Sequence, residues 1–283
     1  MRGRRRASGP STSSPVARES LYGTARFHAA VPLTFESVLL TLVLCAVLCA
    51  LAYVKSVLTW DGSVAAFGVG LLIGALGDVT WLLLLLFFLL SSFVATRYKF
   101  ALKEALGVQE GKKGERRSAN VLANGIAPMA AAIFAFANLS MFPRAATGVV
   151  FMSVLAVAGA DTLASEIGVL SPKAYLITTG KRVKPGTDGG VSALGEACAL
   201  GAALYMGLFG WLVLGSLAPA TMSTQTLSIV IPVVVGFTGC QIDSVLGATL
   251  ERRGLVGKRS VNLISTSLGG VIAFVMLAAA GAL

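Results

Sequence analysis

Residues 81–96 read WLLLLLFFLLSSFVAT, a run without a single charged side chain. A helix needs about 20 apolar residues to cross the hydrocarbon core of a bilayer, so this run and its flanking residues predict one membrane span. Comparable apolar runs occupy 32–54, 121–138, 146–160, 192–217, 225–240 and 261–283. The sequence therefore predicts an all-α fold, a polytopic transmembrane helical bundle.

The composition of the whole chain supports a membrane location. Of the 283 residues, 55% are hydrophobic and 13% are charged, whereas soluble domains carry about 25% charged residues. The mean hydropathy is +0.81, so the lipid bilayer is an expected partner. The only histidine, His28, precedes the first apolar run, which excludes a histidine-based metal site and a Ser-His-Asp triad.

The N-terminal residues 1–30 differ in composition from the rest. They are rich in Arg and Ser, and such a segment cannot build a hydrophobic core, so it is expected to be a disordered tail or a targeting extension. Residues 31–283 are expected to form a single transmembrane helical domain. The net charge of +10 does not indicate nucleic acid, because the cations lie in the tail and in short loops instead of on one folded face.

Outside the tail, most Lys and Arg residues fall in three segments, 97–119, 173–184 and 252–259. Two spans separate each segment from the next, so all three lie on one side of a cell membrane or plastid membrane. The positive-inside rule makes that side cytoplasmic or stromal. The short run 62–77 leaves seven or eight spans open. The rule favours seven, with the tail inside, although Lys55 would then lie outside.

Carboxylates occur where polar stretches meet the ends of spans. GADTLASEIG (159–168) contains Asp161 and Glu166, and GCQIDSVLGATLE (239–251) contains Asp243. Ionisable groups among membrane helices are costly and need partners, which makes them candidate functional groups. Two alternatives stay open: the acids complement a helix dipole, or Asp243 pairs with a neighbouring arginine.

The stretch KPGTDGGVSALGE (184–196) is rich in glycine and follows basic residues. Its glycines allow backbone N–H groups to converge on an anion, and Ser192 can cap the helix that follows. With Lys184 beside it, the turn suits phosphate, although it lacks the Walker pattern. The alternative is a cationic connector that only orients the protein in the membrane.

Amide and guanidinium groups enter the same predicted face. RRSANVLANG (116–125) supplies Arg116, Arg117 and Asn124, and Asn262 enters the last span. Carboxylates with hydroxyls suit Mg²⁺, which proteins usually bind through one or two carboxylates together with substrate phosphates. Positioning and electrostatic stabilisation provide most of the catalysis in phosphoryl transfer.

In their order along the chain, the stretches RRSANVLANG, ADTLASEIG, VKPGTDGGVSALGE and CQIDSVLGATLE resemble an integral membrane family first catalogued as domain of unknown function 92. The resemblance runs from about residue 60 to the C-terminus. This family includes the plant phytyl-phosphate kinase. The resemblance implies a kinase that transfers a phosphoryl group from a nucleoside triphosphate, expected to be CTP, to phytyl or geranylgeranyl monophosphate. The cofactor that it implies is Mg²⁺.

The resemblance and the chemistry of the residue types together suggest roles for individual residues. Asp161, Glu166 and Asp243 are expected to hold Mg²⁺ and to be the catalytic acids, and Arg116 and Arg117 to neutralise the lipid phosphate. The other residues expected to bind phosphate or nucleotide are Lys184, Gly186, Thr187, Gly189, Gly190, Ser192, Ser165, Ser244, Asn124 and Asn262. A histidine base is unnecessary, since the attacking oxygen of a phosphate is already ionised at neutral pH.

Three other functions fit parts of the sequence. A CTP-dependent cytidylyltransferase that makes a CDP-lipid would use the same residues and break a different bond. A transporter would be expected to show inverted repeats and polar residues near the middle of its spans, whereas here they gather at span ends. A scaffolding protein would not require Asp161, Glu166 and Asp243 together. The sequence leaves the prenyl chain and the oligomeric state open.

Overall fold

The structure, a computed structural model, describes residues 33–77, 79–109, 114–215 and 222–283. The expected tail or targeting extension at 1–30 lies outside these residues. Residues Pro32–Leu283 form one compact unit. Its described part is dominated by helices, seven of which are long and apolar enough to cross a membrane, as the sequence predicts.

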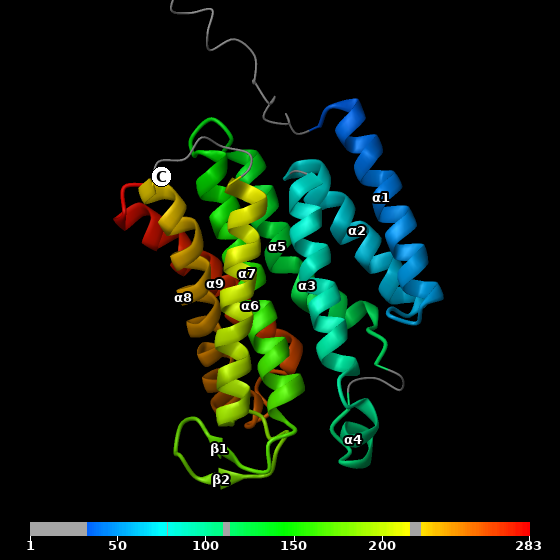
Figure 1. Ribbon diagram of the computed structural model, residues 1–283, viewed down its shortest axis with the longest axis vertical. Coiled ribbons are helices and arrows are strands. Elements are labelled where there is room, and N and C mark those ends of the chain that lie inside the picture. The colour runs from blue at the N-terminus through cyan, green and yellow to red at the C-terminus, as the bar shows by residue number, and fades with distance from the viewer. Residues whose placement is uncertain (1–32, 78, 110–113, 216–221) are drawn as a thin grey trace, which may run out of the picture. The chain divides into compact units, whose positions relative to one another are not determined.

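The helices follow the apolar runs but extend beyond several of them. In chain order they are α1 (Phe35–Val54), α2 (Trp60–Leu76), α3 (Val79–Arg97), α4 (Phe100–Ala105), α5 (Ser118–Ala137), α6 (Arg144–Gly168), α7 (Ala193–Gly215), α8 (Met222–Leu246), the π-helical turn η3 (Gly247–Glu251) and α9 (Lys258–Ala279). Successive long helices run in alternating directions (Figure 1). The segments between α3 and α5, α6 and α7, and α8 and α9 therefore meet at one end of the bundle.

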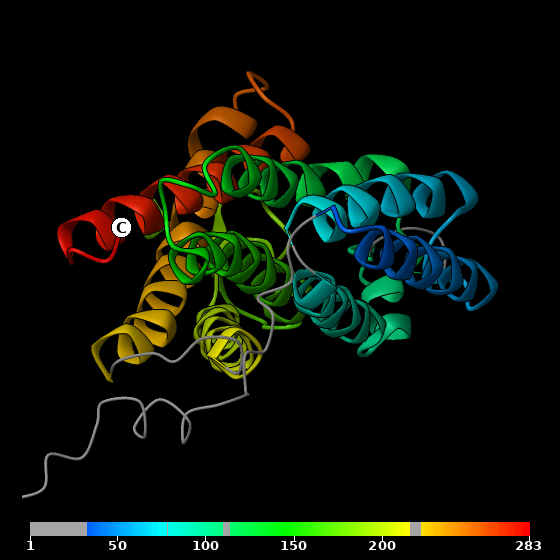
Figure 2. The same ribbon diagram turned by 90° about the horizontal axis from the view of Figure 1, so that it is seen from above.

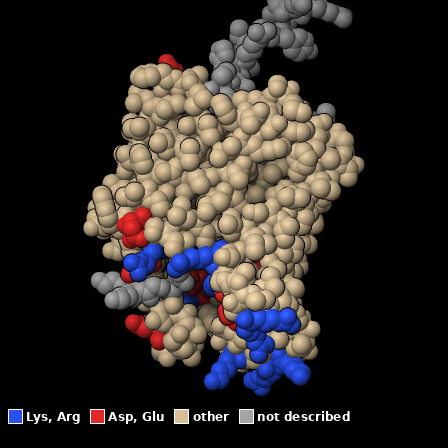
Figure 3. All heavy atoms as spheres, turned by 180° about the vertical axis from the view of Figure 1, so that it is seen from behind, with Lys and Arg blue, Asp and Glu red and all other residues tan. Residues whose placement is uncertain are grey.

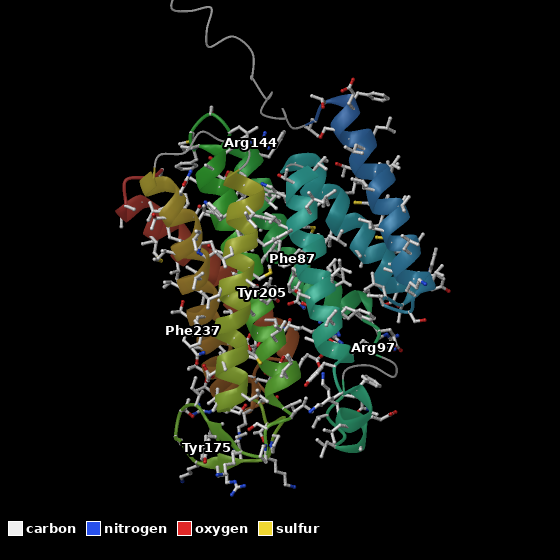
Figure 4. The ribbon with its side chains drawn as sticks, in the orientation of Figure 1. Phe87, Arg97, Arg144, Tyr175, Tyr205 and Phe237 are labelled. Carbon is white, nitrogen blue, oxygen red and sulfur yellow. The ribbon has the colours of Figure 1, made fainter. Side chains whose placement is uncertain are left out.

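The two ends of the bundle differ in charge. Arg97 and Tyr175 lie at the end where the three basic segments meet, and Arg144 lies at the opposite end (Figure 4). On the face turned toward the viewer in Figure 3, most blue and red side chains gather at the first of these ends, and the body between the ends is nearly free of charge. We call the first end the basic end. Its position agrees with the prediction that the three basic segments share one side.

Helix α2, the short run that left the span count open, extends between the two ends. At the basic end, the N–H of Thr59 donates to the carbonyl of Arg116 at 3.1 Å. At the opposite end, the guanidinium of Arg144 donates to the carbonyl of Gly77. Its 17 residues rise about 26 Å, close to the roughly 30 Å of a bilayer core. The arrangement favours eight passes and puts Lys55 at the basic end.

Helix α6 is the centre of the bundle and packs against α3, α5, α7, α8 and α9 (Figure 2). Small residues let its neighbours approach closely, as is common between membrane helices. A Cβ atom added to Gly239 of α8 would lie 2.4 Å from Cγ2 of Val157 on α6. Between α3 and α7, the ring of Phe87 stacks on Phe209 with centroids 3.8 Å apart and meets Tyr205 edge-on (Figure 4).

The connection from α6 to α7 contains a small sheet that the all-α prediction did not include. Strand β1 (Ala174–Leu176) pairs antiparallel with β2 (Arg182–Val183) on one side and with β3 (Gly190–Val191) on the other. The glycine-rich stretch between β2 and β3 is therefore held as a defined loop at the basic end. Extended backbone forms here because Gly186 and Gly189 supply the left-handed turns that return the chain, with φ of +83° and +70°.

Candidate functional site

Two cavities open at the basic end of the bundle. The first has a volume of about 360 Å³ and lies between α6, the β2–β3 loop, the start of α7 and the inner end of α8. The second has a volume of about 280 Å³ and lies between α5, α6 and α9. Both are lined by Asp161, Ser165, Glu166 and Lys258. These four residues therefore mark the place where the cavities meet.

Asp161 and Asp243, from α6 and α8, are brought together at this place. Both side chains line the first cavity, close enough for their charges to interact. The hydroxyl of Ser265 donates to Asp243 at 2.8 Å, and the amide of Asn262 lies 3.5 Å from Asp161. Helix α9 thus orients both carboxyl groups. Asp161, Asp243 and Asn262 therefore converge, as predicted. The partners of Asp243 are Ser265 and Asp161, and not a neighbouring arginine, among the described residues.

Glu166 lines both cavities with Asp161 but has partners of its own. Its Oε2 accepts from Nζ of Lys103 at 2.6 Å, and its Oε1 accepts from the hydroxyl of Thr96 at 2.9 Å. Residues five apart on a helix project about 140° from each other, so Glu166 cannot share the direction of Asp161. Within the described residues, no group of three or more His, Cys, Asp or Glu side chains is placed to hold a metal ion. The structure therefore does not assemble Asp161, Glu166 and Asp243 as one ligand set.

Lys103, on α4, is fully buried, and its ammonium group makes three hydrogen bonds. Besides Glu166, it donates to the carbonyls of Ala95 at 2.8 Å and Thr96 at 3.0 Å. Lys103 ties the end of α3 and the helix α4 to the end of α6. In the sequence, Lys103 is one of several cations in a basic segment, and nothing local indicates a partner 63 positions away.

The β2–β3 loop forms one wall of the first cavity and supplies Gly186, Thr187, Gly189 and Gly190 to its lining. The N–H of Thr187 donates to the carbonyl of Lys184, and the N–H of Gly190 donates to the carbonyl of Thr187. These two N–H groups are therefore used inside the loop. A Cβ atom on Gly189 would lie 2.3 Å from the backbone nitrogen of Ala248, so the loop packs closely on η3.

Several other predicted residues have structural contacts of their own. Ser192 accepts from the N–H of Gly195 at 3.1 Å, as expected of a cap for α7, and donates to the carbonyl of Gly168 at 3.1 Å. The hydroxyl of Ser165 donates to the carbonyl of Asp161 at 2.9 Å. Ser244 lines the first cavity. Ser192 thus joins α7 to the end of α6.

The predicted cations divide between cavity and surface. Arg116 lines the second cavity, whereas Arg117 and Lys184 are exposed and line neither cavity. The N–H of Arg116 donates to the carbonyl of Val57 at 3.0 Å, which fixes its backbone to the turn between α1 and α2. The hydroxyl and N–H of Ser118 donate to Asp61 at 2.7 Å and 3.0 Å. Asp61 therefore stabilises the N-terminus of α5, where a negative charge is favourable.

Two cations of the second cavity, Lys258 and Arg259, are not among the predicted site residues. They lie at the start of α9, in a basic segment whose charge also indicates orientation in the membrane. In the first cavity, Glu196 accepts from the side-chain amide of Gln241 at 2.7 Å, which links α7 to α8. Asn124 lines the second cavity as predicted, and its amide donates to the carbonyl of Asn120 at 3.0 Å.

Comparison with known proteins gives a consistent family. Residues 43–270 match the model of the family described as integral membrane protein DUF92. An uncharacterized membrane protein of Methanocaldococcus jannaschii is 31% identical over 84% of this chain and 95% of its own length. From Arabidopsis thaliana, Protein PGR is 34% identical over 74% of this chain and 77% of its own length, and Protein VTE6, chloroplastic, is 31% identical over 77% of this chain and 65% of its own length. No solved structure matches the chain. The chain belongs to the DUF92 family of integral membrane proteins.

Proposed function

We propose that this protein is a membrane-embedded isoprenoid monophosphate kinase. It transfers the γ-phosphoryl group of a nucleoside triphosphate, CTP in our proposal, to phytyl or geranylgeranyl monophosphate and releases the prenyl diphosphate. The family and the motifs that resemble the plant phytyl-phosphate kinase support this class of reaction. The active face is the basic end, which the positive-inside rule makes cytoplasmic or stromal.

The main support for the proposal is the pair of carboxyl groups, Asp161 and Asp243, in the first cavity beside the place where it meets the second. Two carboxyl groups in contact repel each other once both are ionised, unless a proton or a cation lies between them. A phosphoryl transferase needs a cation at the place where two phosphate groups meet. The pair lies beside the boundary of the cavities, where such a meeting would occur.

The donor set at this place fits Mg²⁺, which prefers oxygen ligands and commonly takes one or two carboxylates with substrate phosphates. Asp161 and Asp243 would hold the ion, and Ser244 lies in the same cavity wall. The ion would neutralise charge on the phosphates. Glu166 is left out of this set because both of its oxygens are engaged.

The reaction is a displacement at phosphorus. An oxygen of the prenyl monophosphate forms a bond to the γ-phosphorus, and the bond from the γ-phosphorus to the β,γ-bridging oxygen breaks, so that the nucleoside diphosphate leaves. The attacking oxygen is ionised already, and no side chain needs to remove a proton. Lys258, which lines both cavities, is placed to stabilise negative charge where the two substrates meet.

Product analysis with labelled CTP tests this proposal. Purified protein in detergent is given geranylgeranyl monophosphate, Mg²⁺ and CTP labelled on either the α- or the γ-phosphate. Label from the γ position in the lipid, with release of CDP, is the expected result. Label from the α position in the lipid, with release of pyrophosphate, would instead identify a cytidylyltransferase and overturn the kinase proposal.

A further inference from the structure

The two cavities differ in the charge of their walls. Among the described residues, six carboxylate side chains and one cation, Lys258, line the first cavity. Three cations line the second, Arg116, Lys258 and Arg259, together with two carboxylates, of which Glu166 is paired with Lys103. An anion that carries no metal ion is therefore better accommodated in the second cavity, and a metal-bound anion in the first.

The two cavities also differ in whether membrane-spanning helices or surface loops border them. The second cavity is lined by Arg116 and by residues of α5, α6 and α9, all three long enough to cross a membrane. Exposed apolar side chains continue along α5 and α9, among them Ile126 and Leu268. The first cavity is bordered instead by the β2–β3 loop and by the segment after α4. A lipid head group would thus reach the second cavity from the membrane, and a soluble nucleotide would reach the first from water.

The second cavity also contains two amide oxygens that lack a hydrogen-bond donor. The carbonyl oxygens of Asn124 and Asn262 are buried and have no hydrogen-bond partner among the described residues. Buried polar atoms in native proteins are nearly always paired. The amide nitrogen of Asn124 already donates to Asn120, which fixes the direction of its oxygen. Phosphate oxygens are acceptors too, so water molecules lying between a bound phosphate and these two amide oxygens would donate to both.

We infer that the second cavity binds the phosphate head group of the prenyl acceptor without a metal ion, and that the first cavity binds the nucleoside triphosphate as its Mg²⁺ complex. This inference rests on the proposed function and divides its two substrates between two sites. Asp161, Ser165, Glu166 and Lys258 border both sites, so phosphate groups bound in the two cavities would face one another there.

Binding measurements test the division without requiring turnover. Calorimetric titration of the full-length protein in detergent compares geranylgeranyl monophosphate, with EDTA present, against CTP with and without Mg²⁺. The prenyl phosphate should bind in EDTA, and CTP should require Mg²⁺. Arg259→Gln should weaken prenyl-phosphate binding about tenfold, the value of one charge-assisted contact, and leave binding of the Mg²⁺–CTP complex within about twofold.

The matched control is Arg253→Gln, which removes an exposed cation close by that lines neither cavity. It should change neither affinity, and geranylgeraniol, which lacks the phosphate, should bind both variants equally. An equal loss of prenyl-phosphate binding in both variants would overturn the assignment, as would a Mg²⁺ requirement for that binding. If binding behaves as expected but no γ-label is transferred, the site stands and the kinase proposal fails. If transfer occurs but Arg259→Gln weakens only CTP, the kinase stands and the division fails.

Discussion

The buried pair of Lys103 and Glu166 gives a stability prediction that is independent of the reaction. In Lys103→Met, the side chain keeps its length and loses its charge, so Glu166 is left without its cation beside the site. The pair has an N–O distance of 2.6 Å, and the side chains are 0% and 11% exposed. Breaking a buried pair by removing one partner costs about 3–5 kcal/mol. We take the lower end, about 3 kcal/mol, because Glu166 keeps some contact with solvent.

Thermal unfolding in detergent measures this cost. For a domain of this size, about 3 kcal/mol corresponds to a decrease in Tm of roughly 6–12 °C. Lys181→Met is the control, because Lys181 is exposed at the basic end, and its Tm should stay within about 1 °C of the wild type. The double variant Lys103→Met with Glu166→Gln removes both charges and should recover much of the loss.

The reasoning would be refuted if Lys103→Met unfolded at the same temperature as Lys181→Met. It would also be refuted if the loss of stability in the double variant exceeded the sum of the losses in the two single variants. The uncompensated charge would then not be the cause of the loss in Lys103→Met. Recovery in the double variant would show that an unpaired Glu166 carboxylate costs more stability than the loss of the whole ion pair.

Two further predictions use glycine positions with matched controls. Gly239→Ala should destabilise the bundle by about 1–3 kcal/mol, because the new methyl group would overlap Val157. Gly201→Ala, on α7 with open space around it, should be neutral or slightly stabilising, and equal Tm values for the two variants would contradict the close packing on α6. Gly189→Ala should raise the KM for CTP at least fivefold, since the loop can no longer rest on η3. Gly180→Ala carries a similar left-handed strain without the overlap, and an equal effect there would mean that strain alone is responsible.

The membrane helices were predictable because hydropathy depends only on local composition. The run at 81–96 became α3, and the run at 146–160 became the middle of α6. The helix continues through Asp161 to Gly168, since the polar residues there find partners in neighbouring helices. Apolar content alone could not predict that α6 ends at Gly168. It also did not decide whether α2 crosses, which depends on contacts at both of its ends.

The candidate site was predictable where residues act through position on a helix. Asp161, Asp243 and Asn262 do converge, as their places at span ends suggested. Glu166 does not join them, and helical geometry could have indicated this, because five positions rotate a side chain to another face. The partner of Glu166 could not be found from sequence, since Lys103 belongs to a short helix whose docking on α6 depends on tertiary packing.

A transfer assay on variants of the carboxyl pair tests whether Asp161 and Asp243 act in catalysis. The rate of γ-phosphoryl transfer from labelled CTP to geranylgeranyl monophosphate is compared for Asp161→Asn, Asp243→Asn and Glu104→Gln, with folding checked by Tm. Glu104 is an exposed acid on α4 that lines neither cavity. We predict that each aspartate variant loses at least about 1,000-fold in rate, or about 4 kcal/mol of transition-state stabilisation, while Glu104→Gln keeps the wild-type rate. Folded Asp161→Asn or Asp243→Asn protein that transfers the label within about tenfold of the wild type would contradict the account.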